Sequence, residues 1–87
     1  MRIVSKPVRM LAVFWPNQNP IPYKFKVAQP DGEMAEIKID KVISSTPHKG
    51  GGADCIIYEC QSYIGNSDRR YVIKYLTKQC QWQLYKM

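Results

Sequence analysis

The sequence predicts an all-β fold, a small antiparallel barrel of about six strands. β-Branched and aromatic residues gather in short runs, and Pro, Gly, Asn and Asp separate these runs. No stretch of ten or more residues follows the 3.6-residue period of an amphipathic helix. A sheet this small must protect its edges, and closure removes them. We therefore expect a barrel of the SH3-like or OB-like kind, with an α+β sheet carrying one short helix as the alternative.

The first two predicted strands are residues 9–15 and 23–27. The segment "PNQNPIP" between them contains three prolines and two asparagines, which forbids a helix and predicts a tight connection. Residues 23–27 alternate strictly, so their apolar side chains share one face while Lys24 and Lys26 share the other. This pattern indicates a half-buried strand with lysines on its outer surface.

The third predicted strand, residues 34–44, follows the turn chemistry of Pro30-Asp31-Gly32. Its apolar residues alternate as far as Ile39, and Val42 then falls on the opposite parity. A bulge or bend near Asp40–Lys41 would explain the change. Such a bend would also help a short sheet to curl.

The last three predicted strands are residues 54–64, 69–76 and 81–86. Connections of about four residues join them, so they should form an antiparallel meander. Gly65 or Asn66 can take the positive φ that a hairpin turn needs.

The predicted core is the set of residues that share the apolar face of each strand. It consists of Leu11, Val13, Tyr23, Phe25, Val27, Ile37, Ile39, Ile57, Tyr71, Ile73, Tyr75, Trp82 and Leu84.

Size and charge limit the classes of function. The 87 residues fit one domain, residues 1–87. Thirteen Lys and Arg against seven Asp and Glu give a net charge of +6. This charge favours acidic partners such as nucleic acid or anionic lipid, and it also serves solubility.

The three cysteines predict free thiols. Their odd number argues against a closed disulfide framework. Cys55 and Cys60 lie on one predicted strand, ~16 Å apart, which a disulfide cannot bridge. We expect a protein of the reducing cytosol, with Cys60 in the core and Cys80 in a turn. The longest apolar run, residues 10–15, is too short for a signal peptide or a membrane helix, so a cytoplasmic location without membrane contact is predicted.

The segment "STPHKGGGADC", Ser45 to Cys55, looks most like a site. A Walker-type phosphate loop needs a Lys and a Ser or Thr after its last glycine and a helix beyond them. Here Lys49 precedes Gly50–Gly52 and a strand follows. The segment is therefore interpreted as a flexible connection, with anion contact through backbone N–H groups as the alternative.

The residues that could carry catalysis or hold a metal are few. His48 and the three cysteines lack the spacing of a zinc site, and no Cys–His pair is signalled by the sequence. Glu36 and Asp40 share a strand face, but a solvated surface explains them. The sequence therefore predicts no enzyme, no cofactor and no metal.

Basic and aromatic residues alternate near the end of the chain, in "RRYVIKY" and "CQWQLYK". Barrels that bind nucleic acid use Lys and Arg for phosphates and aromatic faces for bases. Parity places the tyrosines on the apolar face, as a core would. The predicted nucleic-acid contacts are Lys24, Lys26, Arg69, Arg70 and Lys74.

The alternative function is a protein-interaction or structural module. An exposed strand edge or an apolar patch would then pair with another chain or with a second copy.

Short motifs along the chain resemble the stand-alone small β-barrel domains of unknown function found in bacteria. They are Pro7-Val8, Leu11-Ala12-x-Phe14, Pro20 or Pro22 with Phe25, Ile39-x-Lys41-Val42, Tyr71-x-x-x-Tyr75 and Trp82-x-Leu84. The resemblance implies a barrel fold and leaves the activity open.

Overall fold

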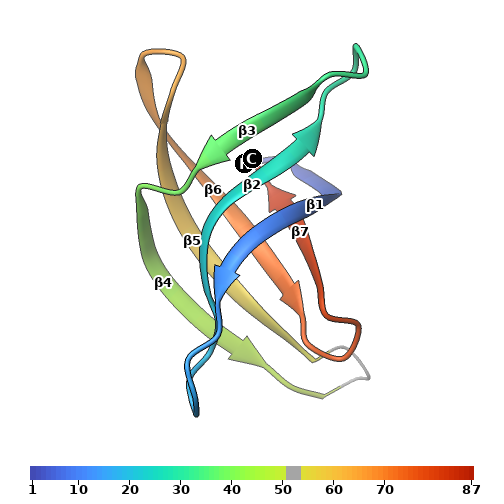
Figure 1. Cartoon of the computed structure of the whole chain (residues 1–87), viewed down its shortest axis with the longest axis vertical. Coiled ribbons are helices and arrows are strands. Elements are labelled where there is room, and N and C mark those ends of the chain that lie inside the picture. Colours follow the sequence, from blue (N-terminus) through green and yellow to red (C-terminus); the bar gives the residue numbers. More distant parts are fainter. Residues whose placement is uncertain (51–53) are drawn as a thin grey trace.

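The computed structural model describes residues 1–50 and 54–87 and is built of strands (Figure 1). The seven strands are β1 (Ile3–Val13), β2 (Ile21–Ala28), β3 (Met34–Lys38), β4 (Lys41–His48), β5 (Cys55–Ile64), β6 (Ser67–Leu76) and β7 (Gln81–Lys86). They form a single sheet in the order β3-β2-β1-β7-β6-β5-β4, and every neighbouring pair is antiparallel. The predicted all-β class and the meander of the last three strands are confirmed.

The curl of this sheet comes from β1 and from the segment that contains β3 and β4. β1 pairs with β7 through its first half, Ile3 to Val8, and with β2 through its second half, Arg9 to Val13. The sheet edges are β3 and β4, which are consecutive parts of one bent segment. Figure 1 shows this segment passing from the β2 side to the β5 side.

The bend between β3 and β4 brings the two edges of the sheet to one corner. The Ile39 N–H donates to the Tyr23 carbonyl on β2 (2.8 Å), and the next N–H, that of Asp40, donates to the Gln61 carbonyl on β5 (3.0 Å). The sheet is therefore barrel-like, as predicted. The expected bend near Asp40–Lys41 divides the third predicted strand in two, which is why seven strands form where six were expected.

The first strand begins earlier than predicted, at Ile3 and not at Arg9. Its pairing with β7 shifts by one residue between Ile3 and Lys6, and Ser5 takes a positive φ of 43°. This bulge, with Pro7 close behind it, interrupts the alternation by which a strand is identified.

Two predicted turns are confirmed. Gly65 and Asn66 form a two-residue hairpin loop, and their φ values of 55° and 67° are those of a type I′ turn. In the β2–β3 turn Gly32 has a φ of 88°, and its N–H donates to the Gln29 carbonyl at 3.0 Å.

The buried core gathers on the concave side of the sheet. It consists of Phe25, Val27, Ile39, Ile56, Tyr58, Cys60, Tyr71, Ile73, Tyr75, Trp82 and Leu84. Eight of these eleven were predicted from strand parity. Cys60 is fully buried and Cys80 lies in an exposed turn, as expected.

The core prediction is wrong for Leu11 and Tyr23, which are 59% and 48% exposed. The register passes from Leu11 opposite Lys24 to Ala12 opposite Pro22, which leaves Tyr23 without a partner. This bulge exchanges the inward and outward sets of β2, so Pro22 is buried in place of Tyr23.

Three other predicted core residues, Val13, Ile37 and Ile57, are only half-buried. For Ile57 the reason is parity. β5 carries apolar residues on both faces, and Ile56 and Tyr58 are the ones that point into the core.

Candidate functional site

The five predicted cations lie in three places. Lys24 and Lys26 are exposed on β2. Arg70 and Lys74 are on β6, on the opposite strand face from Tyr71 and the core. β1 and β7 separate these strands, so the two pairs are three strand spacings apart, ~14 Å measured along the sheet.

Arg69 occupies a third place. It shares the parity of the buried Tyr71, but it lies near the start of β6, where the barrel opens. The structure therefore does not bring all five cations together, and among the described residues no continuous stripe of these cations joins β2 to β6.

A denser cluster of positive charge lies on β1, β2 and β3. Arg9, Lys24, Lys26 and Lys38 are all exposed there, and we call these four residues the cationic face. Arg9 is directly opposite Lys26 in the β1–β2 register, and Lys24 is directly opposite Lys38 in the β2–β3 register. Side chains directly opposite each other share a face and have Cβ atoms about 5 Å apart, so both pairs repel.

One carboxylate offsets part of this charge. Glu36 is opposite Lys26 in the register, and its Oε1 lies 3.8 Å from the Nζ of Lys24. Both side chains of this ion pair are about half exposed, which makes the pair weak. A shallow depression of about 260 Å³ lies on the same strands, and Arg9, Lys24, Lys26 and Glu36 contribute to its lining.

Exposed apolar side chains border the cationic face. Leu11 is opposite Lys24, and Tyr23 precedes Lys24 in the bulge of β2. Beyond the end of β1, away from this face, Phe14 and Trp15 are 62% and 54% exposed, and Phe14 contacts Tyr75. A flat aromatic ring beside several cations is the combination on which single-stranded nucleic acid is bound.

Two lysines on β6 and β7, Lys74 and Lys86, contact an aromatic ring of the chain itself. The Nζ of Lys74 lies 4.0 Å from the ring centroid of Tyr85, and that of Lys86 lies 5.3 Å from the same centroid. Both lysines are half-buried. They are thus engaged with a ring of their own chain in cation–π contacts.

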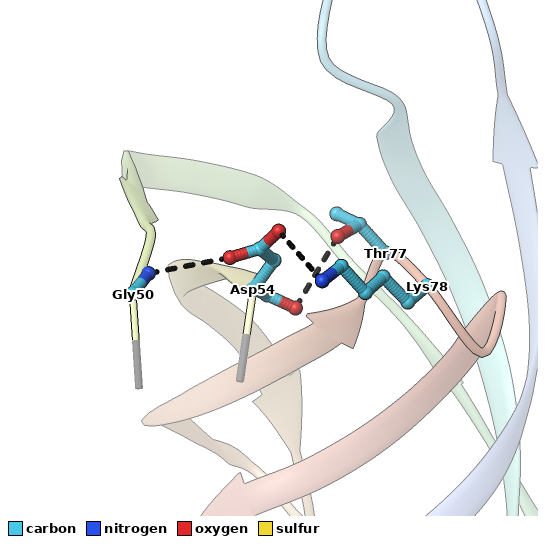
Figure 2. A network of polar contacts seen from close by, with 4 residues as sticks. All are labelled: Gly50, Asp54, Thr77 and Lys78. Atoms are coloured by element: carbon cyan, nitrogen blue, oxygen red, sulfur yellow. Dashed lines mark hydrogen bonds and ion pairs between the residues drawn. The ribbon is translucent and has the colours of Figure 1, made fainter. Parts of the chain in front are cut away.

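The glycine-rich connection between β4 and β5 falls partly outside the described residues, which stop at Gly50 and resume at Asp54. Figure 2 shows how its described ends are tied. The Asp54 carboxylate accepts the Gly50 N–H at 3.3 Å and lies 3.6 Å from the Nζ of Lys78. Thr77 Oγ1 donates to the Asp54 carbonyl at 3.2 Å. At this end of the loop, the backbone N–H of Gly50 and the ammonium group of Lys78 therefore contact a carboxylate of the chain itself.

The three cysteines and His48 do not form one cluster, although Cys55 and His48 are cross-strand neighbours. Cys60 is inside the barrel, and burial raises the pKa of its thiol to about 12. Cys55 is opposite His48 in the β4–β5 register, whereas Cys80 lies in the exposed turn before β7. Within residues 1–50 and 54–87 no three side chains of His, Cys, Asp or Glu stand close enough to hold a metal ion.

Two members of the cationic face, Arg9 and Lys38, were missed from the sequence. Lys38 alternates with Ile37 and Ile39, so its outward direction was visible. The sequence does not show which strands are neighbours. The pairing of β1 with β2 places Arg9 opposite Lys26, and the pairing of β2 with β3 places Lys38 opposite Lys24.

Comparisons of the chain with protein-family models, with curated proteins and with solved structures found no match. The resemblance to small bacterial barrel domains therefore stays a prediction. No helix that could cross a lipid bilayer occurs in the described part of the chain.

Proposed function

We propose that this chain is a non-enzymatic binding module that contacts single-stranded nucleic acid through the cationic face. The observation that carries the proposal is the pair of like-charged cross-strand contacts, Arg9 with Lys26 and Lys24 with Lys38. Such contacts reduce the stability of a sheet, and a bound polyanion would relieve the repulsion.

The neighbouring side chains support the same ligand. Phosphates would contact the four cations, while Tyr23, which is 48% exposed, offers a ring on which a base can stack. Stacking and phosphate contacts need no particular base sequence. The proposed binding is therefore sequence-tolerant and strongly dependent on salt.

The test is fluorescence anisotropy of a labelled 12-nucleotide oligo-dT at about 50 and 200 mM salt. We expect binding at the lower concentration and its loss at the higher one. The triple variant Arg9→Gln/Lys24→Gln/Lys26→Gln should bind at least about tenfold more weakly and lower the salt slope by ~2, since each lost phosphate contact removes about 0.7.

The matched control is Arg70→Gln/Lys74→Gln/Lys86→Gln, which removes the same number of charges from β6 and β7. It should weaken binding much less. Equal losses in the two triple variants would show that net charge alone attracts the oligonucleotide, and the cationic face would then not be the site.

A second pair of variants tests the stacking contact. Tyr23→Ala should weaken binding at least about fivefold, because a stacked base is worth about 1–3 kcal/mol. Tyr63→Ala, which removes another exposed tyrosine from β5, should leave the affinity unchanged.

Phe14 and Trp15 support a second candidate, a protein-interaction module. Both rings are more than half exposed at the end of β1, although Phe14 also contacts Tyr75 edge-on at 6.0 Å. If this patch joins two copies, sedimentation should show a dimer that dissociates in the Trp15→Ser variant. A concentration-independent monomer would contradict self-association.

A further inference from the structure

A basin of about 730 Å³ lies at the open end of the barrel, and the four residues of the cationic face do not line it. Its lining residues come from the β2–β3 hairpin, from the β5–β6 hairpin and from both ends of the chain. Figure 1 shows these two hairpins projecting at the same end of the molecule. The core residues Val27 and Leu84 form the floor of the basin. Val4, Ile37 and Ile64 form apolar parts of its walls. It is therefore an apolar depression continuous with the core of the molecule.

Three cations stand around these apolar walls. Arg2 and Lys6 come from the β1 side, and Arg69 comes from β6, where its parity directs it toward the concave side of the sheet. Glu36 is the one acidic side chain among the described residues that line the basin, and it is paired with Lys24 on the outer face. The rim thus has a surplus of positive charge.

The walls distinguish this basin from a nucleic-acid site. Among the described residues that line it, none is aromatic, so a base would find no ring on which to stack. Aliphatic walls instead match a hydrocarbon chain. The volume falls within the range of about 300–1,000 Å³ of small-molecule sites, which recur in the mouths of β-barrels.

We propose that the basin binds an organic anion with an aliphatic tail, a carboxylate on a hydrocarbon chain. The tail lies along Val4, Ile37 and Leu84, and the carboxylate is held at the rim by Arg69, whose guanidinium can donate two parallel hydrogen bonds to it. Lys6 and Arg2 add charge at the same rim. This site and its ligand class are separate from the nucleic-acid contact proposed above.

The test is a titration with decanoate, kept below its micelle range, followed by amide chemical shifts in NMR. We expect saturable one-to-one binding with the largest shifts at Val4, Ala35 and Ile37. Decanol, which has the same tail without the charge, should bind at least about tenfold more weakly because charge-assisted hydrogen bonds are lost.

Adjacent residues provide the matched variants. Arg69→Gln should weaken decanoate binding about tenfold, whereas Arg70→Gln removes the same charge from the opposite strand face and should change it less than about twofold. Ala35→Leu fills part of the basin and should also weaken binding, while oligonucleotide binding by that variant stays unchanged. If Ala35→Leu fails to fold, the comparison of Arg69 with Arg70 decides.

Three results would overturn the proposal. They are the lack of saturable shifts at millimolar decanoate, shifts centred on Tyr23 and Lys24, and equal effects of Arg69→Gln and Arg70→Gln. The first would show that the basin binds no aliphatic carboxylate. The second and third would show that decanoate responds to general positive charge and not to this site.

Discussion

Ser62 shows, at the scale of a residue, how the barrel accommodates polar atoms inside it. Its hydroxyl donates to the Lys38 carbonyl at 2.6 Å, and the Tyr71 hydroxyl lies 2.6 Å from the same Ser62 oxygen. Because Ser62 has only one proton to donate, Tyr71 must be the donor in the second bond. Both side chains are almost completely buried, so neither hydroxyl can turn to water.

This geometry predicts an asymmetry between two conservative variants. Ser62→Ala leaves the Tyr71 hydroxyl and the Lys38 carbonyl without their partner and should lower the free energy of unfolding by ~2–3 kcal/mol. Tyr71→Phe leaves Ser62 bonded to Lys38 and should cost only ~1 kcal/mol. Urea unfolding monitored by circular dichroism measures both. Equal costs would mean that the donor direction is wrong.

Cys60 predicts a loss of stability at alkaline pH. Burial raises the pKa of its thiol from 9.0 to about 12 and also raises the pKa of the Tyr58 and Tyr71 hydroxyls. The folded state therefore holds protons that the unfolded state releases. The corresponding stability is fully present below pH 9 and is lost as the pH rises toward 12.

The measurement is the urea midpoint between pH 8 and pH 11, where one such group contributes up to about 1.4 kcal/mol per pH unit. Cys60→Ala is less stable overall but should show a shallower decline. Ile56→Val, a core change that removes no ionisable group, should keep the wild-type slope. Parallel declines in all three proteins would exclude Cys60 as a source.

At the scale of the element, bulges determine which side of a strand is buried. Strand parity correctly identified Phe25 and Val27, because β2 pairs with β3 without a shift, and the inward residues of β6, because β6 pairs with β5 without a shift. It also identified Trp82 and Leu84, since the single shift between β6 and β7 comes only beyond Leu84. It failed at Tyr23, where one unpaired residue exchanges the two faces. Pro22 beside Tyr23 is a residue that strands tolerate at bulges, but the position of the bulge is set by the pairing of β2 with β1.

The loop between β5 and β6 was predictable because its requirement is local. Gly65 has a φ of 55°, which a β-branched residue adopts only under strain. Gly65→Val should therefore lower the free energy of unfolding by about 1–2 kcal/mol. Asn66→Gly, which keeps a residue suited to positive φ, should leave it nearly unchanged. Equal thermal midpoints for the two variants would contradict a type I′ turn.

At the scale of the whole molecule, the two tryptophans separate core from surface. Trp82 is 8% exposed and packs against Tyr75 and Tyr58, with ring centroids 4.4 and 5.6 Å away. Trp15 is 54% exposed. Trp82→Ala should lower the free energy of unfolding by ~3–5 kcal/mol, whereas Trp15→Ala should change it by less than ~0.5 kcal/mol. Denaturant titration of both variants tests the assignment, and similar losses would refute it.

The fold was more predictable than the candidate site, for a physical reason. Strand class, turns and most core residues depend on alternation within a few residues. The cationic face depends on contacts between strands, since Arg9 meets Lys26 across β1 and β2, and Lys38 meets Lys24 across β2 and β3. Arg70 and Lys74 were grouped with Lys24 because the sequence does not show that β1 and β7 stand between them.

The corner at Ile39 and Asp40 makes it possible to follow how the sheet opens locally. The Ile39 N–H donates its hydrogen bond to β2, and the adjacent Asp40 N–H donates its hydrogen bond to β5. The hydrogen-exchange rate of the Ile39 amide therefore reports the opening of the β2 side of the sheet, and that of the Asp40 amide reports the opening of the β5 side. Joint exchange would mean that both flanks come apart in one motion, and a slower rate at one amide would identify the flank that separates last.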